Sequence, residues 1–384
     1  MAKKILHICY EYPPVGGGGG DACKNIVEHL ELFTYEQKVL TSHFSGLPTS
    51  ERKHKYEVIR IKAFRKFMNH CSITEMGYFI IFGIIPMIKL MIRWKPDLIH
   101  AHFAVPSGVL AFLGSFLFRK PYILTFQGGD VPSFVPNETS KIYSLVHFPV
   151  HYICKLAKAR IAVSSGLATM AENDFPGTKF ICILNGVDLK LKVDISMRRK
   201  QPGPIKFLFA GRLADQKNPE FLVRAFANMV QLPGWHLDII GEGPLKNAVQ
   251  DLIVQFKLSD RVQLHGWFTK EKLFQKMIES DVLLLPSKIE GLPTIGVQAL
   301  AHGMIVIGTN TIGIADIVID SKNGYLFPKD DLHKFESLLK YVTENPEEVN
   351  RMSRYAIDSV DKYDWNQIAK NYSELYLQIF DQAR

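Results

Sequence analysis

Short apolar segments recur along the whole sequence, and a segment with helical spacing separates most of them. In the first half they are KKILHICY, EQKVLTS, DLIHAHF, PYILTFQ, RIAVSS and FICIL, and in the second half IKFLFAG, HLDIIG, RVQLHG, DVLLLPS, MIVIG and GYLF. Strands that are apolar along their whole length are typical of parallel sheets covered by helices on both faces. The sequence therefore predicts an α/β protein with one doubly wound, Rossmann-like sheet in each half.

A polar, basic, Pro- and Gly-rich segment separates the two halves. It reads LKLKVDISMRRKQPGP and occupies residues 189–204. A chain of 384 residues is long enough for two domains of ordinary size. We expect one domain over residues 1–188 and a second over 205–364, facing each other across a cleft. Apolar residues at helical spacing predict a final helix over 365–384.

The cysteines and the amino terminus indicate the compartment. There are five cysteines, an odd number without paired spacing, which argues against disulfides and against a structural zinc site. The first residues, MAKKILHICYEYPP, contain too short an apolar stretch for a signal peptide. Both observations favour a cytoplasmic location.

The positive charge is concentrated in one segment. Between Arg52 and Lys95 there are ten Lys/Arg and two Asp/Glu, a surplus equal to the net charge of +8 of the whole chain. The same segment contains MGYFIIFGIIPMIKLMI, which is shorter than the about 20 apolar residues of a membrane span and includes Pro86 and Lys89. Two interpretations stay open: peripheral binding to an anionic membrane, or a solvated basic loop beside a core helix. Nucleic acid is not an expected partner, because no stacking aromatic residues alternate with the basic ones.

A run of five glycines, PPVGGGGGDACKNIVEHL, joins the first strand to a helix. Such a turn can bring backbone N–H groups against a phosphate, although a flexible loop without a ligand is an equal alternative. Counted from Gly16 and Gly18, the third glycine of a dinucleotide fingerprint would be Asp21. The second strand ends without an acidic residue for a ribose, and no Gly-Lys-Ser/Thr follows the run. These absences argue against a nicotinamide dehydrogenase and against a P-loop.

Two cations and one carboxylate follow strands of the second half. FAGRLADQKNPEFLVRAF places Arg212 and Lys217 after its first strand, where a planar guanidinium and a mobile ammonium can clamp a diphosphate. PSKIEGLPTIGVQALAHG places Glu290 beyond a buried strand, where open α/β sheets bind ligands. We expect a helix that has Pro293 at its first position and Gly303 just past its last turn.

Several motifs in this order and spacing resemble the retaining glycosyltransferases of family four, which have the two-domain GT-B fold. They are GRL..QKN, IIGEGPL, LPSKIEGLPTIGVQALAHG and IGIADIV....NGYLF, and in the first half GGGGG, PDLIHAHFAVPSG, TFQGGD, AVSSGL and NGVD. The resemblance covers nearly the whole chain. It implies that the second domain binds a UDP- or GDP-sugar, that the first binds the acceptor, and that the final helix crosses back to the first domain.

The resemblance also implies roles for individual residues. Arg212 and Lys217 would hold the donor diphosphate, and Glu290 would hydrogen-bond the sugar hydroxyls; these three are the predicted catalytic residues. The backbone N–H groups of Thr294 and Ile295 would reach the distal phosphate.

Further predicted ligand contacts come from loops elsewhere in the chain. Gly17 and Gly18 would close over the distal phosphate from the first domain, and the base would lie near Gly266. On the acceptor side we expect His102 and Asp130 near the substrate, although a packed histidine at a strand end is an equal alternative for His102.

Two positions depart from the family pattern. Gln298 stands where the family usually has a glutamate for the ribose hydroxyls, which removes a charge-assisted contribution of about 1 kcal/mol. Gln127 stands where a histidine is common, and an amide can bind a sugar but cannot exchange a proton.

Together these features predict a hexosyltransferase that keeps the anomeric configuration. The cations would take the place of a metal, since no Asp-x-Asp pair suggests a metal site, and the nucleotide sugar would be a co-substrate with no further cofactor. We expect the acceptor to be a glycan or lipid-linked glycan in cell-surface polysaccharide synthesis, on the inner face of the membrane. The alternatives are a degenerate nucleotide-sugar-binding protein, or an epimerase or hydrolase of the same fold.

Overall fold

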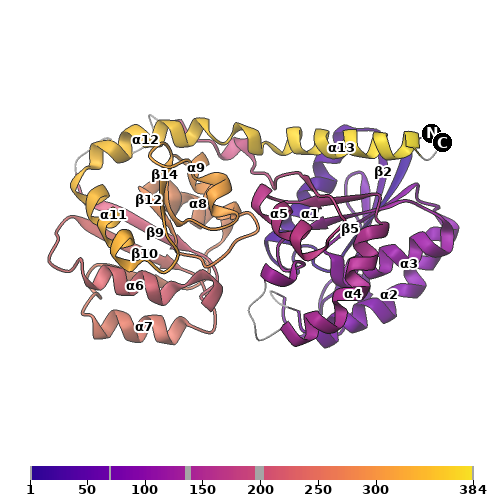
Figure 1. The fold of residues 1–384 in the computed structure, drawn as a ribbon, viewed down its shortest axis with the longest axis horizontal. Coiled ribbons are helices and arrows are strands. Elements are labelled where there is room, and N and C mark those ends of the chain that lie inside the picture. The colour runs from indigo at the N-terminus through magenta and orange to yellow at the C-terminus, as the bar shows by residue number, and fades with distance from the viewer. Residues whose placement is uncertain (1, 69–70, 135–139, 195–202, 383–384) are drawn as a thin grey trace. The chain divides into compact units, whose positions relative to one another are not determined.

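The computed structural model describes residues 2–68, 71–134, 140–194 and 203–382 (Figure 1). The chain divides into two compact units. Unit 1 comprises Met1–Asn185 and Trp365–Arg384, and unit 2 comprises Gly186–Asp364. Half of the predicted linker, residues 195–202, lies outside the described residues.

Unit 1 contains an eight-stranded sheet with the order β3-β4-β2-β1-β5-β6-β7-β8. Its strands are β1 (Lys3–Cys9), β2 (Tyr35–His43), β3 (Ser50–Arg52), β4 (Tyr56–Lys62), β5 (Leu98–His102), β6 (Tyr122–Phe126), β7 (Ala159–Ala162) and β8 (Ile181–Cys182). Its main helices are α1 (Gly18–His29), α2 (Ile73–Arg93), α3 (Val109–Phe118), α4 (Ser140–Leu156), α5 (Ser165–Asp174) and α13 (Trp365–Gln382). All neighbouring strands are parallel except β3 and β4.

The final helix returns to unit 1, as predicted. α13 begins at Trp365 and lies along this unit in yellow in Figure 1, against α1. Its apolar side chains pack into the core formed by the sheet and α1, where Tyr372 and Tyr376 are fully buried. The hydroxyl of Tyr35 on β2 also lies 2.8 Å from the hydroxyl of Ser373. The helical spacing read from the sequence is therefore the spacing of the buried face of α13.

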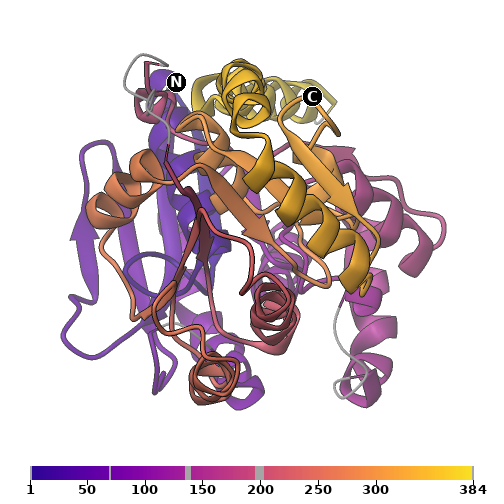
Figure 2. The same cartoon turned by 90° about the vertical axis from the view of Figure 1, so that its left-hand side faces the viewer.

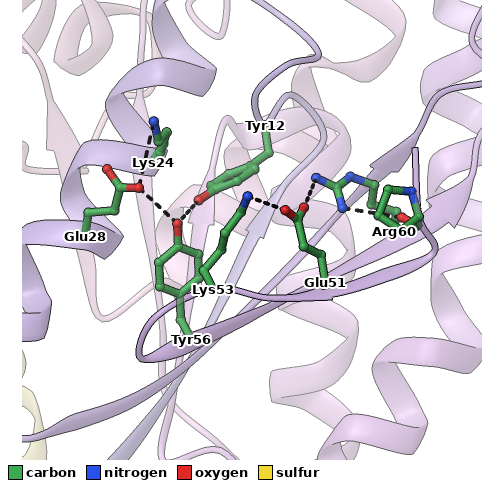
Figure 3. A network of polar contacts seen from close by, with 8 residues as sticks. Tyr12, Lys24, Glu28, Glu51, Lys53, Tyr56 and Arg60 are labelled. Atoms are coloured by element: carbon green, nitrogen blue, oxygen red, sulfur yellow. Dashed lines mark hydrogen bonds and ion pairs between the residues drawn. The ribbon is translucent and has the colours of Figure 1, made fainter. Parts of the chain in front are cut away.

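A polar network supports the glycine-loop edge of unit 1 (Figure 3). The Tyr12 hydroxyl donates to the Tyr56 hydroxyl at 2.8 Å, and the Tyr56 hydroxyl donates to Glu28 at 3.2 Å. Nearby, the Arg60 guanidinium donates to Glu51 at 3.0 Å and so joins β4 to β3. These contacts fix the chain that leaves β1 against α1 and β4.

Unit 2 contains a six-stranded parallel sheet with the order β11-β10-β9-β12-β13-β14. Its strands are β9 (Ile205–Ala210), β10 (Trp235–Ile240), β11 (Val262–His265), β12 (Val282–Leu285), β13 (Ile305–Thr309) and β14 (Gly324–Phe327). Its helices are α6 (Pro219–Ala227), α7 (Lys246–Gln255), α8 (Lys270–Glu279), α9 (Thr294–Ala301), α10 (Ile314–Ile317), α11 (Leu332–Glu344) and α12 (Pro346–Asp358). Helices lie on both sides of this sheet, with α6 against α7 and α11, and α9 against α12 (Figures 1 and 2).

Each sheet reverses its winding direction beside its first strand. The reversal lies between β1 and β5 in unit 1 and between β9 and β12 in unit 2. Because crossovers between parallel strands are right-handed, helices on the two sides of the reversal cover opposite faces. The loops at the carboxyl ends of these strands diverge there and leave room for a ligand. The prediction of two Rossmann-like sheets with a returning final helix is confirmed.

Candidate active site

In unit 2 the loops after β9 and β12 are bonded to each other at the reversal point. The Lys288 backbone N–H donates to the Gln216 carbonyl at 2.8 Å, and the Gln216 amide donates to the Ile289 carbonyl at 3.0 Å. The Lys288 ammonium also pairs with Asp215 at 2.6 Å. The two loops therefore form one continuous surface at the carboxyl edge of the sheet.

This surface brings two of the predicted catalytic residues together. Lys217 ends the short 3₁₀ turn η7 (Asp215–Lys217), and its ammonium lies 2.5 Å from a carboxylate oxygen of Glu290. The Glu290 side chain is 8% exposed and that of Lys217 is 22% exposed. Because water is largely excluded, either charge would be costly without a partner, so the contact holds the two side chains in place.

Arg212 follows β9 directly and is exposed. In the described part of the chain its guanidinium has no hydrogen-bond or ion-pair partner. A Cβ added to the preceding Gly211 would lie 3.9 Å from Cε of Lys217, so the lysine side chain passes beside this point of the backbone. The arrangement leaves a cation next to the Lys217–Glu290 pair that is available to an anion.

Helix α9 starts just beyond Glu290. Pro293 was expected at the first helical position, but it is the N-cap and the helix begins at Thr294. Gly303 has φ +72° just past the last turn, as predicted. The first N–H groups of a helix have no intrahelical acceptor, which applies here to Thr294 and Ile295. Together with the helix dipole, they form an anion-binding end.

Gln298 lies one turn further along α9, on the same face as Thr294 because the two are four residues apart. Its side-chain amide is half-buried and makes no hydrogen bond to other described residues. The amide therefore keeps its donors and its acceptor for a ligand that reaches this face.

The loops after β10 and β11 extend the same edge. A Cβ on Gly241, which has φ +155°, would lie 1.9 Å from the Gly211 carbonyl oxygen, so only glycine allows this approach. A Cβ on Gly266 would lie 2.9 Å from a carboxylate oxygen of Glu242. In strand order the predicted donor residues therefore follow β11, β9 and β12 at one edge of one sheet.

In unit 1 the glycine run starts α1, with Gly17 as N-cap and Gly18 as the first helical residue. Packing accounts for part of the run, because a Cβ on Gly19 would lie 2.3 Å from the Phe103 ring. Gly17 has open space around its Cβ position, whereas a Cβ on Gly16 would lie 3.0 Å from a carboxylate oxygen of Glu11. Burial raises the pKa of Glu11. Our sequence analysis missed this carboxylate, although it follows the first strand by two residues.

His102 ends β5, and Asp130 lies in the loop that follows β6. His102 is fully buried, its Nε2 is 3.3 Å from Nδ1 of His7, and its Nδ1 has no partner among the described residues; this is the environment of a packed histidine. The Asp130 carboxylate accepts the N–H of Ala104 at 2.7 Å and that of Gln127 at 2.9 Å. Burial raises the pKa of Asp130 to about 7. Asp130 therefore holds the loops after β5 and β6 together.

Gln127 pairs with a residue that our sequence analysis did not single out. The Asn185 amide donates to the Gln127 side-chain carbonyl at 2.8 Å, and Asn185 belongs to the NGVD motif. The Gln127 Nε2 and the Asn185 Oδ1 are buried without a partner in the described residues. Buried polar atoms are rarely left unpaired, so one donor and one acceptor are free here for a group such as a hydroxyl.

Two family models match consecutive parts of the chain. The model described as Glycosyltransferase Family 4 matches residues 16–191, and the model described as Glycosyl transferases group 1 matches residues 194–359. Together they span both units.

Relatives and solved structures agree with this match. The glycogen synthase of Mycobacterium tuberculosis is 23% identical and covers 97% of this chain and 94% of its own. The UDP-Gal:alpha-D-GlcNAc-diphosphoundecaprenol alpha-1,3-galactosyltransferase of Escherichia coli is 25% identical over 68% of this chain and 70% of its own.

Two solved structures have the same fold. Sucrose-phosphate synthase from Thermosynechococcus elongatus has a TM-score of 0.86 at 20% identity and covers 99% of this chain and 100% of its own. Anabaena HepE in complex with UDP-glucose has a TM-score of 0.76 at 17% identity and covers 98% of this chain and 99% of its own.

Proposed function

This chain belongs to the family-four, group 1 glycosyltransferases of the GT-B fold, which transfer a sugar from a nucleotide-sugar donor, and from this premise we propose its reaction and substrates. It moves a hexose-type sugar from a UDP- or GDP-sugar to a hydroxyl of a glycan or lipid-linked glycan, with retention of the anomeric configuration. The observation that carries the proposal is the Lys217–Glu290 pair at the sheet reversal, beside the unpaired Arg212.

When the donor binds, its diphosphate replaces Glu290 as the partner of Lys217. A diphosphate carries more negative charge than a carboxylate, so it competes with Glu290 for Lys217 and draws in Arg212. Glu290 is then free to accept hydrogen bonds from the hydroxyls of the donor sugar. The first turn of α9 receives the distal phosphate, and Gln298 receives the ribose.

The chemical step breaks the bond between the anomeric carbon and the distal phosphate oxygen. Negative charge grows on that oxygen, and Arg212 and Lys217 stabilise it, taking the place of a metal ion. The acceptor hydroxyl forms the new bond on the same face of the sugar and passes its proton to the leaving diphosphate. This front-face route needs no protein nucleophile.

The test is removal of the unpaired cation. We expect Arg212→Ala to lower kcat/KM by roughly 100-fold or more, because one charge-stabilising donor contributes about 2.7–4 kcal/mol in the transition state. The donor is first chosen by thermal protection with a panel of UDP- and GDP-sugars, and turnover is then followed by release of the nucleoside diphosphate. Arg224→Ala, which removes an exposed arginine of α6, is the matched control. Full turnover of Arg212→Ala would refute the assignment.

A second candidate function is nucleotide-sugar binding without transfer, which Gln298 and Gln127 favour because both replace residues usual in the family. Donor protection without product on any lipid or glycan acceptor would support it. Conversion of the donor without an acceptor would instead indicate an epimerase or a hydrolase.

We propose that the acceptor is lipid-linked and that the protein works on the inner face of the membrane in cell-surface polysaccharide synthesis. The name of the Escherichia coli relative includes a diphosphoundecaprenol acceptor. In the described part of this chain α2 is the one helix long and apolar enough to cross a bilayer. Its buried face, with Phe79, Gly83 and Met87, packs on β4 and α3, which supports a helix lying on the membrane. Flotation with anionic vesicles tests the location.

A further inference from the structure

A half-open pocket lies at the start of α2, on unit 1. Its volume is about 700 Å³, within the roughly 300–1,000 Å³ of small-molecule sites. Its lining comprises four aromatic residues, one lysine and the first turn of the helix: Phe64, Phe67, Tyr78, Phe82, Lys66, Ser72, Thr74 and Glu75.

The aromatic rings form an exposed cluster. The ring centroid of Phe64 is 5.4 Å from that of Tyr78 and 5.5 Å from that of Phe82, both in edge-on geometry. Phe64 is 60% exposed and Phe67 is 54% exposed. Exposing several aromatic rings side by side is unfavourable in water, and such patches mark binding surfaces.

A rigid polar frame holds these rings at the surface. The two carboxylate oxygens of Glu75 accept the backbone N–H groups of Lys66 at 2.8 Å and of Ser72 at 2.7 Å, and Ser72 caps α2 in return. Phe64 itself has φ +51°, a conformation unfavourable for a bulky residue. The pocket is therefore preformed by its surroundings.

The pocket adjoins the glycine loop. The Gly16 N–H donates to the Met68 carbonyl at 2.6 Å, which joins the loop carrying Phe64 and Phe67 to the start of the glycine run. A molecule in this pocket would thus lie beside the edge of unit 1 where the acceptor is expected.

Most polar groups of the pocket are already hydrogen-bonded. Ser72 and Glu75 satisfy each other in the capping box, and the Thr74 hydroxyl lies 3.2 Å from that of Ser72. The Lys66 ammonium is exposed and has no partner in the parts of the chain the structure covers. A sugar needs several free donors and acceptors, whereas this pocket offers apolar walls and one cation.

We propose that this pocket binds the apolar chain of a lipid-linked acceptor, with Lys66 on the phosphate that joins the chain to its sugar. The assignment rests on the proposed transferase function and deepens it by naming the site that binds the lipid chain of the acceptor. Continuity supports it, because Tyr78 and Phe82 begin an exposed apolar face of α2 that continues through Ile85 and Ile92. A chain longer than the pocket can lie along this face.

The probe is farnesyl phosphate, titrated below its micelle concentration into the full chain by calorimetry, with inorganic phosphate as the headgroup control. We expect saturable binding of farnesyl phosphate and at least tenfold weaker binding of inorganic phosphate. The double variant Phe64→Ala/Phe82→Ala should bind farnesyl phosphate at least tenfold more weakly, and Lys66→Gln several-fold more weakly. Phe116→Ala, which removes a ring that is 73% exposed on α3, should bind as the wild type does.

Thermal protection by the selected nucleotide sugar reports on unit 2 and verifies that each variant is folded. No binding of farnesyl phosphate, or equal loss in the double variant and in Phe116→Ala, would overturn the pocket assignment. Vesicle flotation that depends on Phe64 and Phe82 without binding of the free probe would also overturn it, in favour of simple membrane insertion. If farnesyl phosphate binds but no nucleotide sugar raises the unfolding temperature, the pocket assignment is supported and the proposed function is refuted.

Discussion

At the scale of single residues, the Lys217–Glu290 pair shows how a charged site can be stable when no ligand is bound. Each side chain follows a different strand, and the 2.5 Å contact with little exposure keeps both charges compensated. The neighbouring Arg212 has no such partner among the described residues, so it is the group most available to an incoming diphosphate. The site is therefore partly neutralised and partly open before the donor arrives.

Gln298 provides a prediction at this scale. We expect Gln298→Glu to tighten donor binding up to about tenfold, because a carboxylate adds a charge-assisted hydrogen bond to the ribose hydroxyls that the amide lacks. Calorimetric dissociation constants for the selected nucleotide sugar measure the effect, and Gln298→Ala should weaken binding. Equal affinity in all three proteins would show that position 298 does not contact the donor.

Some residues of the site could be predicted from the sequence, and others could not. Arg212, Lys217 and Glu290 could be singled out because they follow buried strands in combination, within motifs that resemble the family pattern. Asn185 was missed because its importance comes from Gln127, a hydrogen-bond partner distant in the sequence. Glu11 was missed because its contact with the glycine run depends on how the loop folds back on it.

At the scale of secondary-structure elements, three buried histidines link the sheet of unit 1 to α13. His100 contacts the Tyr376 hydroxyl of α13 at 2.7 Å and the Thr125 hydroxyl of β6 at 2.8 Å. His7 lies 3.1 Å from the Gln37 side-chain carbonyl, so its Nε2 carries the proton and its Nδ1 accepts from His102. With neutral rings every one of these contacts can be a hydrogen bond, and burial favours the neutral form.

The acid stability of the chain should report this network. Burial lowers the pKa of His7 to about 4 and holds those of His100 and His102 well below the usual 6.5. Below pH 6.5 these histidines are protonated in the unfolded chain but stay neutral in the folded chain. Their contribution to the free energy of unfolding therefore falls as the pH drops from 6.5 towards 4. His7 alone contributes about 3 kcal/mol to this loss.

Urea unfolding between pH 8 and pH 4.5 measures the loss. His7→Gln should flatten the dependence between pH 6.5 and pH 5, and His236→Gln, at an exposed position, should not. The raised pKa of Asp130 gives an opposite contribution in this range that is common to the wild type and both variants. The same slope in wild type and His7→Gln would contradict the interpretation.

Among the elements, β4 was missed by our sequence analysis. Its residues YEVIRIK alternate between the two faces, and the segment was interpreted through its basic charge. The edge position explains the pattern, because only β3 lies beyond β4 in the sheet. Central strands are buried on both faces and so were easy to recognise from continuous apolar runs.

At the scale of the whole molecule, the charge distribution gives unit 1 a basic side. The segment from Arg52 to Lys95 carries a surplus equal to the net charge of the chain, and it includes α2 with its exposed apolar face. Near the end of α2, Lys89 and Arg93 line a second pocket of about 400 Å³ together with Trp94. Cations beside exposed apolar side chains suit an anionic bilayer surface.

Flotation with anionic vesicles should recover the protein at low salt and lose it as salt rises, because the Debye length shortens to about 3 Å at 1 M. Lys89→Glu/Arg93→Glu should weaken the association roughly tenfold or more, at about 1 kcal/mol for each basic residue removed from the surface. Lys329→Glu/Lys340→Glu makes the same charge change at exposed positions of unit 2 and should have little effect. No association at low salt would refute the membrane location.

The sequence by itself determined the two parallel sheets, the final helix and the chemical character of the donor residues, because strand burial and helix periodicity are local properties of residue order. It could not determine which loops meet. The pairing of Lys217 with Glu290 and the packing of His102 against His7 depend on strand order and crossover direction. Those contacts join residues far apart in the chain, and only the folded arrangement brings them within bonding distance.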